Sequence, residues 1–254
     1  MDISYLSLKD KVALISGASR GIGKAIALTF AEAGADVVIS GRKLPDLEEA
    51  AAEIEEAGGR VLPVAAHSRK PEDLERLVAT TNGEFGRLDI LVNNAATNPV
   101  MKPLIEIDEE IFDLIIATNL KGYFLLSQLA ARQMIQQGGG TILNISSVGG
   151  LSPDRGLGVY CISKAAINML TRALALELGE QNIRVNALAP GVVKTRFSQA
   201  LWSNEKLMAQ EMAHTPLGRI AEPEEIARLA LAVVTDAASY VTGQIIVMDG
   251  GGSI

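Results

Sequence analysis

The sequence is poor in the residues that build disulfides, metal centres and aromatic cores. Its 254 residues include one cysteine, two histidines and one tryptophan, and aromatic residues make up 4% of the chain. A single cysteine, Cys161, excludes an intrachain disulfide, and the two histidines suggest no zinc cluster, so we expect no bound metal. The core must be built mainly from Ala, Val, Ile and Leu, within the 48% of residues that are hydrophobic.

Positive charge is also scarce. The chain has 23 Lys and Arg against 30 Asp and Glu, a net charge of −7, which is the wrong sign for a polyanionic partner such as nucleic acid or an acidic membrane. Residues 1–5 lack the basic segment and apolar run of a signal peptide. No stretch approaches the roughly 18 apolar residues of a membrane span. We therefore expect a cytoplasmic protein that acts on small molecules, with no nucleic acid or membrane as partner.

Short apolar runs alternate with helical patterns along the whole chain. Strands are predicted at 11–16, 36–40, 61–64, 88–92, 141–145, 184–188 and 244–248, and helices at 22–33, 45–57, 71–85, 108–137, 159–178 and 223–234. Strands rich in Val, Ile and Leu are typical of a parallel sheet covered by helices on both faces. The sequence predicts a single α/β domain over 1–254, with a doubly wound parallel sheet of the Rossmann type. Residues 189–216 are expected to be an irregular lid over the substrate.

A glycine-rich segment follows the first predicted strand. It reads Ser16-Gly17-Ala18-Ser19-Arg20-Gly21-Ile22-Gly23 and leads into a predicted helix. Glycines let the backbone approach an anion, and a helix N-terminus offers free N–H groups, so this position favours a pyrophosphate. A turn that only packs helix on strand is the alternative. No Lys-Ser/Thr pair follows Gly23, which argues against phosphoryl transfer.

The end of the second predicted strand has no acidic residue. An NAD site places Asp or Glu there to bind the ribose 2′-hydroxyl, whereas this chain has Ser40-Gly41-Arg42-Lys43. Arg42, and Arg20 within the glycine segment, offer cationic donors suited to a 2′-phosphate. The sequence therefore favours NADP(H) over NAD(H). The alternative is that Arg42 and Lys43 are only solvated surface charges.

Tyr160 and Lys164 are four residues apart in a predicted helix, so their side chains share one face. A free phenol, with a pKa of about 10, is a poor acid or base at neutral pH, but a neighbouring ammonium favours the phenolate and lowers that pKa. Ser147 follows a predicted strand, at the edge where parallel strands present catalytic groups. These positions predict that Ser147 hydrogen-bonds a carbonyl while Tyr160 delivers a proton to it, and that Ser146 points to the opposite face.

Over essentially its whole length the chain resembles the short-chain dehydrogenase/reductase family, in its classical subdivision. The motifs that carry the resemblance are Ser16-Gly17-x-x-x-Gly21-x-Gly23, Asn93-Asn94-Ala95-Ala96, Asn119, Ser147, Tyr160-x-x-x-Lys164 and Pro190-Gly191-Val192-Val193-Lys194-Thr195. The resemblance implies a catalytic tetrad. In it Tyr160 is the acid/base, Ser147 orients the carbonyl, Lys164 lowers the tyrosine pKa and holds the nicotinamide ribose, and Asn119 supports a proton-relay water.

The resemblance also implies the cofactor and substrate residues. Those expected at the cofactor are Gly17, Ser19, Arg20, Gly21, Ile22, Gly23, Arg42, His67, Ser68, Asn94, Ala95, Tyr160, Lys164, Pro190, Gly191, Val193 and Thr195. Those expected to line the substrate pocket are Ser147, Leu151, Val159, Phe197, Leu201 and Trp202. For the last three, local loop packing or a subunit contact is the alternative.

His67 stands where many family members carry an aspartate beside the adenine. With Asn98-Pro99 and the 194–202 segment, it makes the chain similar to the NADPH-dependent, peroxisomal-type tetrameric carbonyl/retinal reductases. That resemblance implies a homotetramer. A peroxisomal location is not expected, because the chain ends in Gly252-Ser253-Ile254 rather than a Ser-Lys-Leu-type signal.

Together these features predict an NADP(H)-dependent oxidoreductase that transfers hydride between the nicotinamide and a carbonyl or secondary alcohol. Two alternatives stay open. A 3-oxoacyl-carrier-protein reductase would share the whole tetrad. A non-catalytic NADP(H)-binding sensor would keep the fold without the chemistry.

Overall fold

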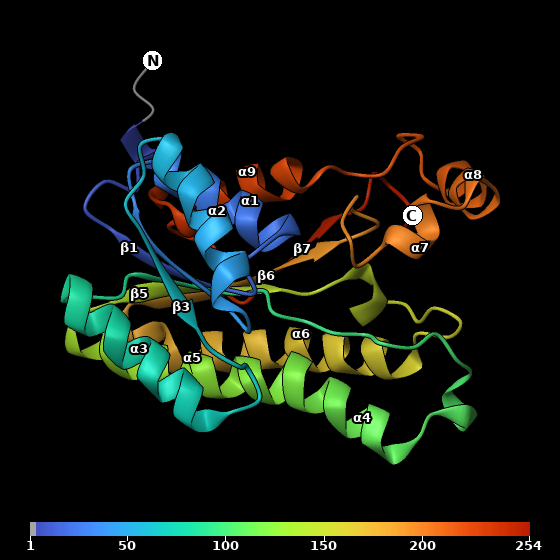
Figure 1. Ribbon diagram of the computed structural model, residues 1–254, viewed down its shortest axis with the longest axis horizontal. Coiled ribbons are helices and arrows are strands. Elements are labelled where there is room, and N and C mark those ends of the chain that lie inside the picture. The colour runs from blue at the N-terminus through green and yellow to red at the C-terminus, as the bar shows by residue number, and fades with distance from the viewer. Residues whose placement is uncertain (1–3) are drawn as a thin grey trace.

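The computed structural model describes residues 4–254, and the strands in this range form one parallel sheet (Figure 1). The strand order is β3-β2-β1-β4-β5-β6-β7. The strands are β1 (Val12–Ser16), β2 (Asp36–Gly41), β3 (Val61–Ala65), β4 (Ile90–Asn93), β5 (Gly140–Ile145), β6 (Ile183–Pro190) and β7 (Ile245–Met248). The predicted doubly wound α/β fold is confirmed.

Helices cover both faces of the sheet (Figure 1). One face carries α1 (Gly21–Glu32), α2 (Leu44–Glu56) and α9 (Pro223–Val234), and the other carries α3 (Pro71–Phe85), α5 (Gly122–Gln136) and α6 (Gly158–Leu178). A separate hydrophobic cluster fills each interface. Ala13 and Ile15 of β1 belong to one cluster and Leu14 to the other, because successive strand side chains point to opposite faces. Burial on both faces explains why the strand sequences are almost uninterrupted Val, Ile, Leu and Ala.

The predicted helix at 108–137 is two helices in the structure. α4 (Glu109–Ile116) and α5 are joined by a π-helical turn at Ala117–Lys121. In that turn the backbone N–H of Gly122 bonds to the carbonyl of Ala117, five residues back. Single π turns inside helices occur frequently at functional sites, and this one contains Asn119.

The segment at 189–216 is not irregular as predicted. β6 extends to Pro190, and the segment contains two helices, α7 (Gln199–Trp202) and α8 (Glu205–His214). The side chain of Asn204 caps α8 by accepting the backbone N–H groups of Lys206 and Leu207, at 3.1 and 3.2 Å. The Asn204-Glu205 start signal was available in the sequence. We refer to residues 191–216 below as the lid.

Residues 109–136 differ from the expectation that no stretch is apolar enough to span a membrane. This stretch is long and apolar enough to cross a membrane, with a mean hydropathy of 1.2 over its best window, half of which is buried in the protein. The buried side of α5 includes Leu126, Ala130 and Met134, which pack into the cluster beneath β4 and β5. The apolar character of this helix is accounted for in part by the core of the protein.

The sheet has a switch point between β1 and β4. The chain leaves β1 toward β2 and β3, then crosses back to place β4 on the other side of β1, with Ala13 opposite Ile90. Ligands of open α/β sheets bind where the strand order reverses, beyond the carboxyl ends of the strands. The glycine segment after β1 and the Asn94-Ala95 pair after β4 meet at this point.

Candidate active site

The glycine segment forms a tight cradle at the N-terminus of α1. Gly17 has a φ of +66°, and a Cβ atom there would lie 2.7 Å from the Cα atom of Ala95. A Cβ on Gly23 would lie 2.5 Å from the Asn94 side-chain nitrogen. Within residues 4–254 no side chain caps the start of α1, so its first N–H groups face the cradle. Backbone donors at a helix N-terminus fit the pyrophosphate of a dinucleotide.

Asn94 and Ser16 brace this cradle. The Asn94 side-chain nitrogen donates to the backbone carbonyls of Ser16 and Gly17, at 3.0 and 2.9 Å. The Ser16 hydroxyl accepts the backbone N–H groups of Asn94 and Ala95, at 3.0 and 3.2 Å. The Asn94 amide, expected at the cofactor, therefore fixes the loop in the structure. The remaining residues of the segment, Ser19, Arg20 and Ile22, lie at its turn into α1, with Arg20 exposed.

Basic side chains gather beyond the ends of β2 and β3. Arg42 is exposed directly after β2. His67 is half-buried after β3, and its backbone N–H donates to the Asp73 carboxylate at 2.8 Å. Burial lowers the pKa of His67, and the neighbouring cations of Arg69, Arg42 and Lys70 lower it further. This edge therefore offers positive charge where a 2′-phosphate would lie if the cradle holds a dinucleotide.

Arg69 is a residue that the sequence analysis missed. Its backbone N–H donates to His67 Nδ1 at 3.2 Å, and its guanidinium lies 3.5 Å from Nε2 of the same ring. The Ser68-Arg69-Lys70 run after β3 was the available signal. Ser68 itself packs its backbone against the start of α5, where a Cβ on Gly122 would lie 2.7 Å from the Ser68 carbonyl oxygen.

Ser147, Tyr160 and Lys164 meet at the carboxyl end of β5. Ser147 begins the short turn at Val148–Gly150, and its hydroxyl accepts the Gly149 N–H at 3.1 Å. Tyr160 and Lys164 lie one turn apart near the start of α6. Burial raises the pKa of Tyr160, and the nearby Ser147 hydroxyl lowers it by a smaller amount. The structure thus brings the predicted serine and tyrosine into contact.

The protonation of the pair differs from the sequence prediction. Burial raises the pKa of Tyr160 to about 12 and lowers the pKa of Lys164 to about 7. The Lys164 ammonium lies 5.6 Å from the centre of the Tyr160 ring and donates to the carbonyl of Ile145 at 2.7 Å. The expectation of a lowered Tyr160 pKa assumes that Lys164 lies close to the phenol and is always charged. Burial makes this assumption fail, because it disfavours the charged form of both side chains.

Asn119 lies in the π turn and is completely buried. Its side chain accepts the Thr97 N–H at 2.8 Å and donates to the Thr97 carbonyl at 3.0 Å and to the Ser163 hydroxyl at 3.1 Å. Ser163 in turn donates to the carbonyl of Tyr160 at 2.6 Å. Asn119 therefore connects the segment after β4 to the first turn of α6, which carries Tyr160.

Three comparisons with known proteins agree with this geometry. A family model described as enoyl-(acyl carrier protein) reductase matches residues 17–253. Dehydrogenase/reductase SDR family member 4 of Oryctolagus cuniculus is 41% identical over 244 residues, 96% of this chain and 94% of the relative. The 3-oxoacyl-[acyl-carrier-protein] reductase FabG of Thermotoga maritima is 39% identical over 247 residues, 97% of this chain and 99% of the relative.

A solved structure gives the same result. A 7α-hydroxysteroid dehydrogenase in complex with NADH and 7-oxo glycochenodeoxycholic acid matches with a TM-score of 0.95 and 37% identity, covering 99% of this chain and 98% of the other. The protein belongs to the classical short-chain dehydrogenase/reductase family. As a member of that family it is an oxidoreductase.

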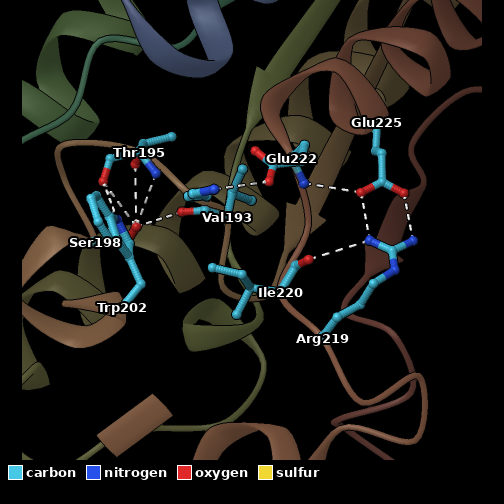
Figure 2. Close-up of polar contacts among 9 residues, drawn as sticks. Val193, Thr195, Ser198, Trp202, Arg219, Ile220, Glu222 and Glu225 are labelled. Carbon is cyan, nitrogen blue, oxygen red and sulfur yellow. Dashed lines mark hydrogen bonds and ion pairs between the residues drawn. The ribbon is translucent and has the colours of Figure 1, made fainter. Parts of the chain in front are cut away.

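The lid of this dehydrogenase/reductase is organised around Ser198 (Figure 2). The Ser198 hydroxyl accepts the Thr195 N–H at 3.2 Å, and its single proton lies within reach of the carbonyls of Val193 and Thr195. The Trp202 indole donates to the Thr195 carbonyl at 2.8 Å. Trp202, expected to line the substrate pocket, thus bonds within the lid, and Leu201 precedes it in the same short helix, half-buried.

Two further contacts hold the base of the lid. Val193 is buried and pairs with Ala221, and the Lys194 ammonium lies 3.4 Å from the Glu222 carboxylate (Figure 2). Gly191, after the buried Pro190 at the end of β6, donates to the carbonyl of Met248 in β7 at 2.9 Å. The lid therefore starts from a fixed point on the sheet.

The lid contacts both the glycine segment and Tyr160. The Thr195 methyl group lies against Gly21, where an added Cβ would be 3.3 Å away. The Phe197 ring lies 5.7 Å from the Tyr160 ring, centre to centre, with 40° between the planes. Phe197 is 55% exposed, so its other side remains open to a ligand.

The other predicted pocket residues differ in exposure. Leu151 is 51% exposed, whereas Val159 is 2% exposed and faces the interior of the protein. A cavity of about 350 Å³ adjoins this segment, lined by Pro103, Leu104, Asp154, Arg155, Gly156 and Gly158. A larger cavity of about 510 Å³ lies among α8, the loop before α9 and the end of β7, and its lining includes Glu211, Arg219 and Asp249. None of the predicted substrate residues lines the larger cavity.

Proposed function

We propose that the protein is an NADP(H)-dependent oxidoreductase that interconverts a carbonyl group and a secondary alcohol in a small molecule. The observation that carries the proposal is the convergence of Ser147, Tyr160 and Lys164 at the edge of the sheet that also holds the glycine cradle. The bound nicotinamide supplies the hydride. The relative solved with NADH supports a nicotinamide cofactor.

Ser147 and Tyr160 have different roles toward the substrate oxygen: Ser147 donates a hydrogen bond and Tyr160 transfers a proton. The Ser147 oxygen accepts the Gly149 N–H, so the hydroxyl proton is the group that it offers to a substrate carbonyl. Tyr160 delivers a proton to the same oxygen as that oxygen becomes an alkoxide. With a pKa of about 12 the phenol stays protonated at neutral pH, and an alkoxide is a stronger base than a phenolate. These properties favour reduction of a carbonyl at neutral pH.

Replacing Tyr160 tests this proposal. Tyr160→Phe removes the proton donor and keeps the ring that contacts Phe197. We expect kcat for carbonyl reduction to fall by about 10²- to 10⁴-fold, the usual contribution of a general acid. The measurement is NADPH absorbance with a panel of ketones and aldehydes. NADPH affinity, measured by fluorescence, should change much less than kcat, since the variant loses a single hydroxyl and keeps the ring. Full turnover in the variant would contradict the mechanism.

The NADP(H) preference is supported by the cations at the end of β2. Arg42→Asp replaces a charge-assisted donor by the carboxylate typical of an NAD site. We expect the ratio of kcat/KM for NADPH over NADH to fall at least about tenfold, since a hydrogen bond to a charged group contributes about 1.5–3 kcal/mol. Lys43→Asp, one residue further along, is the matched control for net charge. An unchanged ratio in Arg42→Asp would refute the cofactor preference.

A 3-oxoacyl-carrier-protein reductase is the second candidate. The similarity to the Thermotoga maritima enzyme of that name favours it. Parallel assays with a 3-oxoacyl carrier protein and with the free carbonyl panel distinguish the two activities. NADPH binding with no turnover of either substrate would instead indicate a sensor.

The proposal includes a homotetramer that works in the cytoplasm. Large apolar side chains are exposed along α6 at seven-residue spacing, with Ile162 at 45%, Met169 at 62% and Leu176 at 86% exposure. Phe124 and Ile135 are exposed on neighbouring α5. Large exposed apolar side chains gathered on two helices are typical of subunit contacts. Cell fractionation tests the location.

A further inference from the structure

Asn168 is a buried polar residue of α6 with no role in the tetrad. It lies four residues beyond Lys164 and eight beyond Tyr160, so the three side chains share one face of the helix. Only 6% of Asn168 is exposed. Its side-chain oxygen accepts the Ser146 hydroxyl at 2.6 Å, and its side-chain nitrogen donates to the Gly150 carbonyl at 3.0 Å.

These two hydrogen bonds lie on either side of Ser147. Ser146 follows the end of β5, and Gly150 ends the short turn that begins after Ser147. The Ser146 hydroxyl also lies 3.3 Å from the carbonyl of Lys164. One amide therefore connects α6 to the chain both before and after the serine.

The turn rests directly on the backbone of α6. A Cβ atom on Gly150 would lie 2.7 Å from the carbonyl carbon of Lys164 and 2.9 Å from the Asn168 side-chain nitrogen. A Cβ on Gly149 would lie 3.2 Å from the Cys161 sulfur and 3.4 Å from the Ser147 oxygen. This close contact fixes the turn, and with it Ser147, against the helix that carries Tyr160.

We propose that Asn168 is a positioning residue that sets the distance between the Ser147 hydroxyl and the Tyr160 phenol. The proposal rests on the function proposed above. An amide suits this role because it accepts from Ser146 and donates to Gly150 at the same time. A leucine has a similar size but forms neither bond. Asn168 itself touches no reacting atom and acts only through Ser147.

A double-mutant cycle tests the proposal. Asn168→Leu is measured in the wild-type background and in Ser147→Ala, by single-turnover oxidation of NADPH with enzyme in excess. In the wild-type background we expect the rate to fall by about 10- to 100-fold, the range produced by misplacement of a reacting group. In Ser147→Ala the same substitution should change the rate by less than twofold, because the group that it positions is gone. NADPH affinity should stay within twofold of wild type.

Ser146→Ala provides a second, milder test. It removes the hydroxyl that bonds to Asn168 and lies near the Lys164 carbonyl, and it keeps the Asn168 side chain, so it reports on this contact if Asn168→Leu fails to fold. We expect a three- to tenfold loss of rate in the wild-type background and less than twofold in Ser147→Ala.

Thr171→Val is the matched control. Thr171 is buried in the same helix and accepts a hydrogen bond from Asn144 at 2.9 Å, but it touches neither Ser146 nor Gly150. We expect it to change the rate by less than twofold in both backgrounds while lowering the unfolding temperature. Equal losses in both backgrounds for Asn168→Leu and Ser146→Ala would overturn the positioning role. Undiminished turnover in Tyr160→Phe would instead overturn the proposed function.

Discussion

Lys164 shows what burial does to a cation. The side chain is 2% exposed, and the hydrogen bond that it forms goes to the Ile145 carbonyl. Burial lowers its pKa from 10.5 to about 7, so at neutral pH the folded protein holds this proton only in part. The unfolded chain keeps it until about pH 10.5. The same burial that brings the ammonium near Tyr160 therefore weakens its charge.

This difference predicts a pH-dependent stability. Between pH 7 and 10.5 the unfolded chain binds more protons at Lys164 than the folded chain does, so its contribution to stability rises with pH. We expect the free energy of unfolding of wild type, relative to Lys164→Met, to increase by about 2 kcal/mol between pH 7 and pH 9. Guanidinium titrations at both pH values measure it. Met134→Leu, a buried change with no titrating group, should show no such increase.

The site could be predicted from sequence only in part. The Tyr160–Lys164 spacing and the position of Ser147 follow from local periodicity, so their proximity is predictable. The pKa of Tyr160 is not predictable from sequence, because it depends on how completely Tyr160 and Lys164 are buried. Asn168 was missed because it acts through contacts with Ser146 and Gly150, which are distant in the chain and which one sequence does not show. Arg69 contacts His67, two residues away, so it could have been found in the basic run after β3.

At the scale of elements, the lid differs most from its prediction. The expectation of an irregular segment follows from its few periodic apolar residues, but helix formation in α8 depends on the Asn204 cap rather than on periodicity. The π turn at Ala117–Lys121 is likewise invisible in sequence, because the apolar pattern continues through it. The strands were predictable because the central ones, β1, β4, β5 and most of β6, are buried on both faces, while the edge strands β3 and β7 are only partly buried.

Ser198 gives a test of the lid. Ser198→Ala removes the hydroxyl that joins Val193, Thr195 and the start of α7. Thr195 lies against Gly21, so a loosened lid should weaken ligand binding more than chemistry. We expect KM for NADPH to rise about three- to tenfold, as for the loss of one or two hydrogen bonds, with kcat changed less than twofold. Ser203→Ala, an exposed serine of the same segment, is the control. A change confined to kcat would contradict this role.

At the scale of the whole molecule, the exposed apolar face of α6 predicts association. Met169→Glu places a charge in the middle of the row formed by Ile162, Met169 and Leu176. Burying an unpaired carboxylate is costly, so we expect the variant to sediment as smaller species than wild type. Analytical ultracentrifugation at matched concentration measures it. Leu207→Glu, an equally apolar exposed position on α8, should leave the sedimentation unchanged.

Sheet topology has a consequence for how the molecule is made. All neighbouring strands in the sheet are parallel. Two such strands can pair only after the crossover segment that connects them has been synthesised. β7 follows all other strands in the chain, yet it holds the Pro190–Gly191 turn through the carbonyl of Met248. The cradle after β1 therefore emerges first and the support of the lid last. A ribosome-bound chain that lacks β7 has the glycine cradle without the strand that anchors the lid.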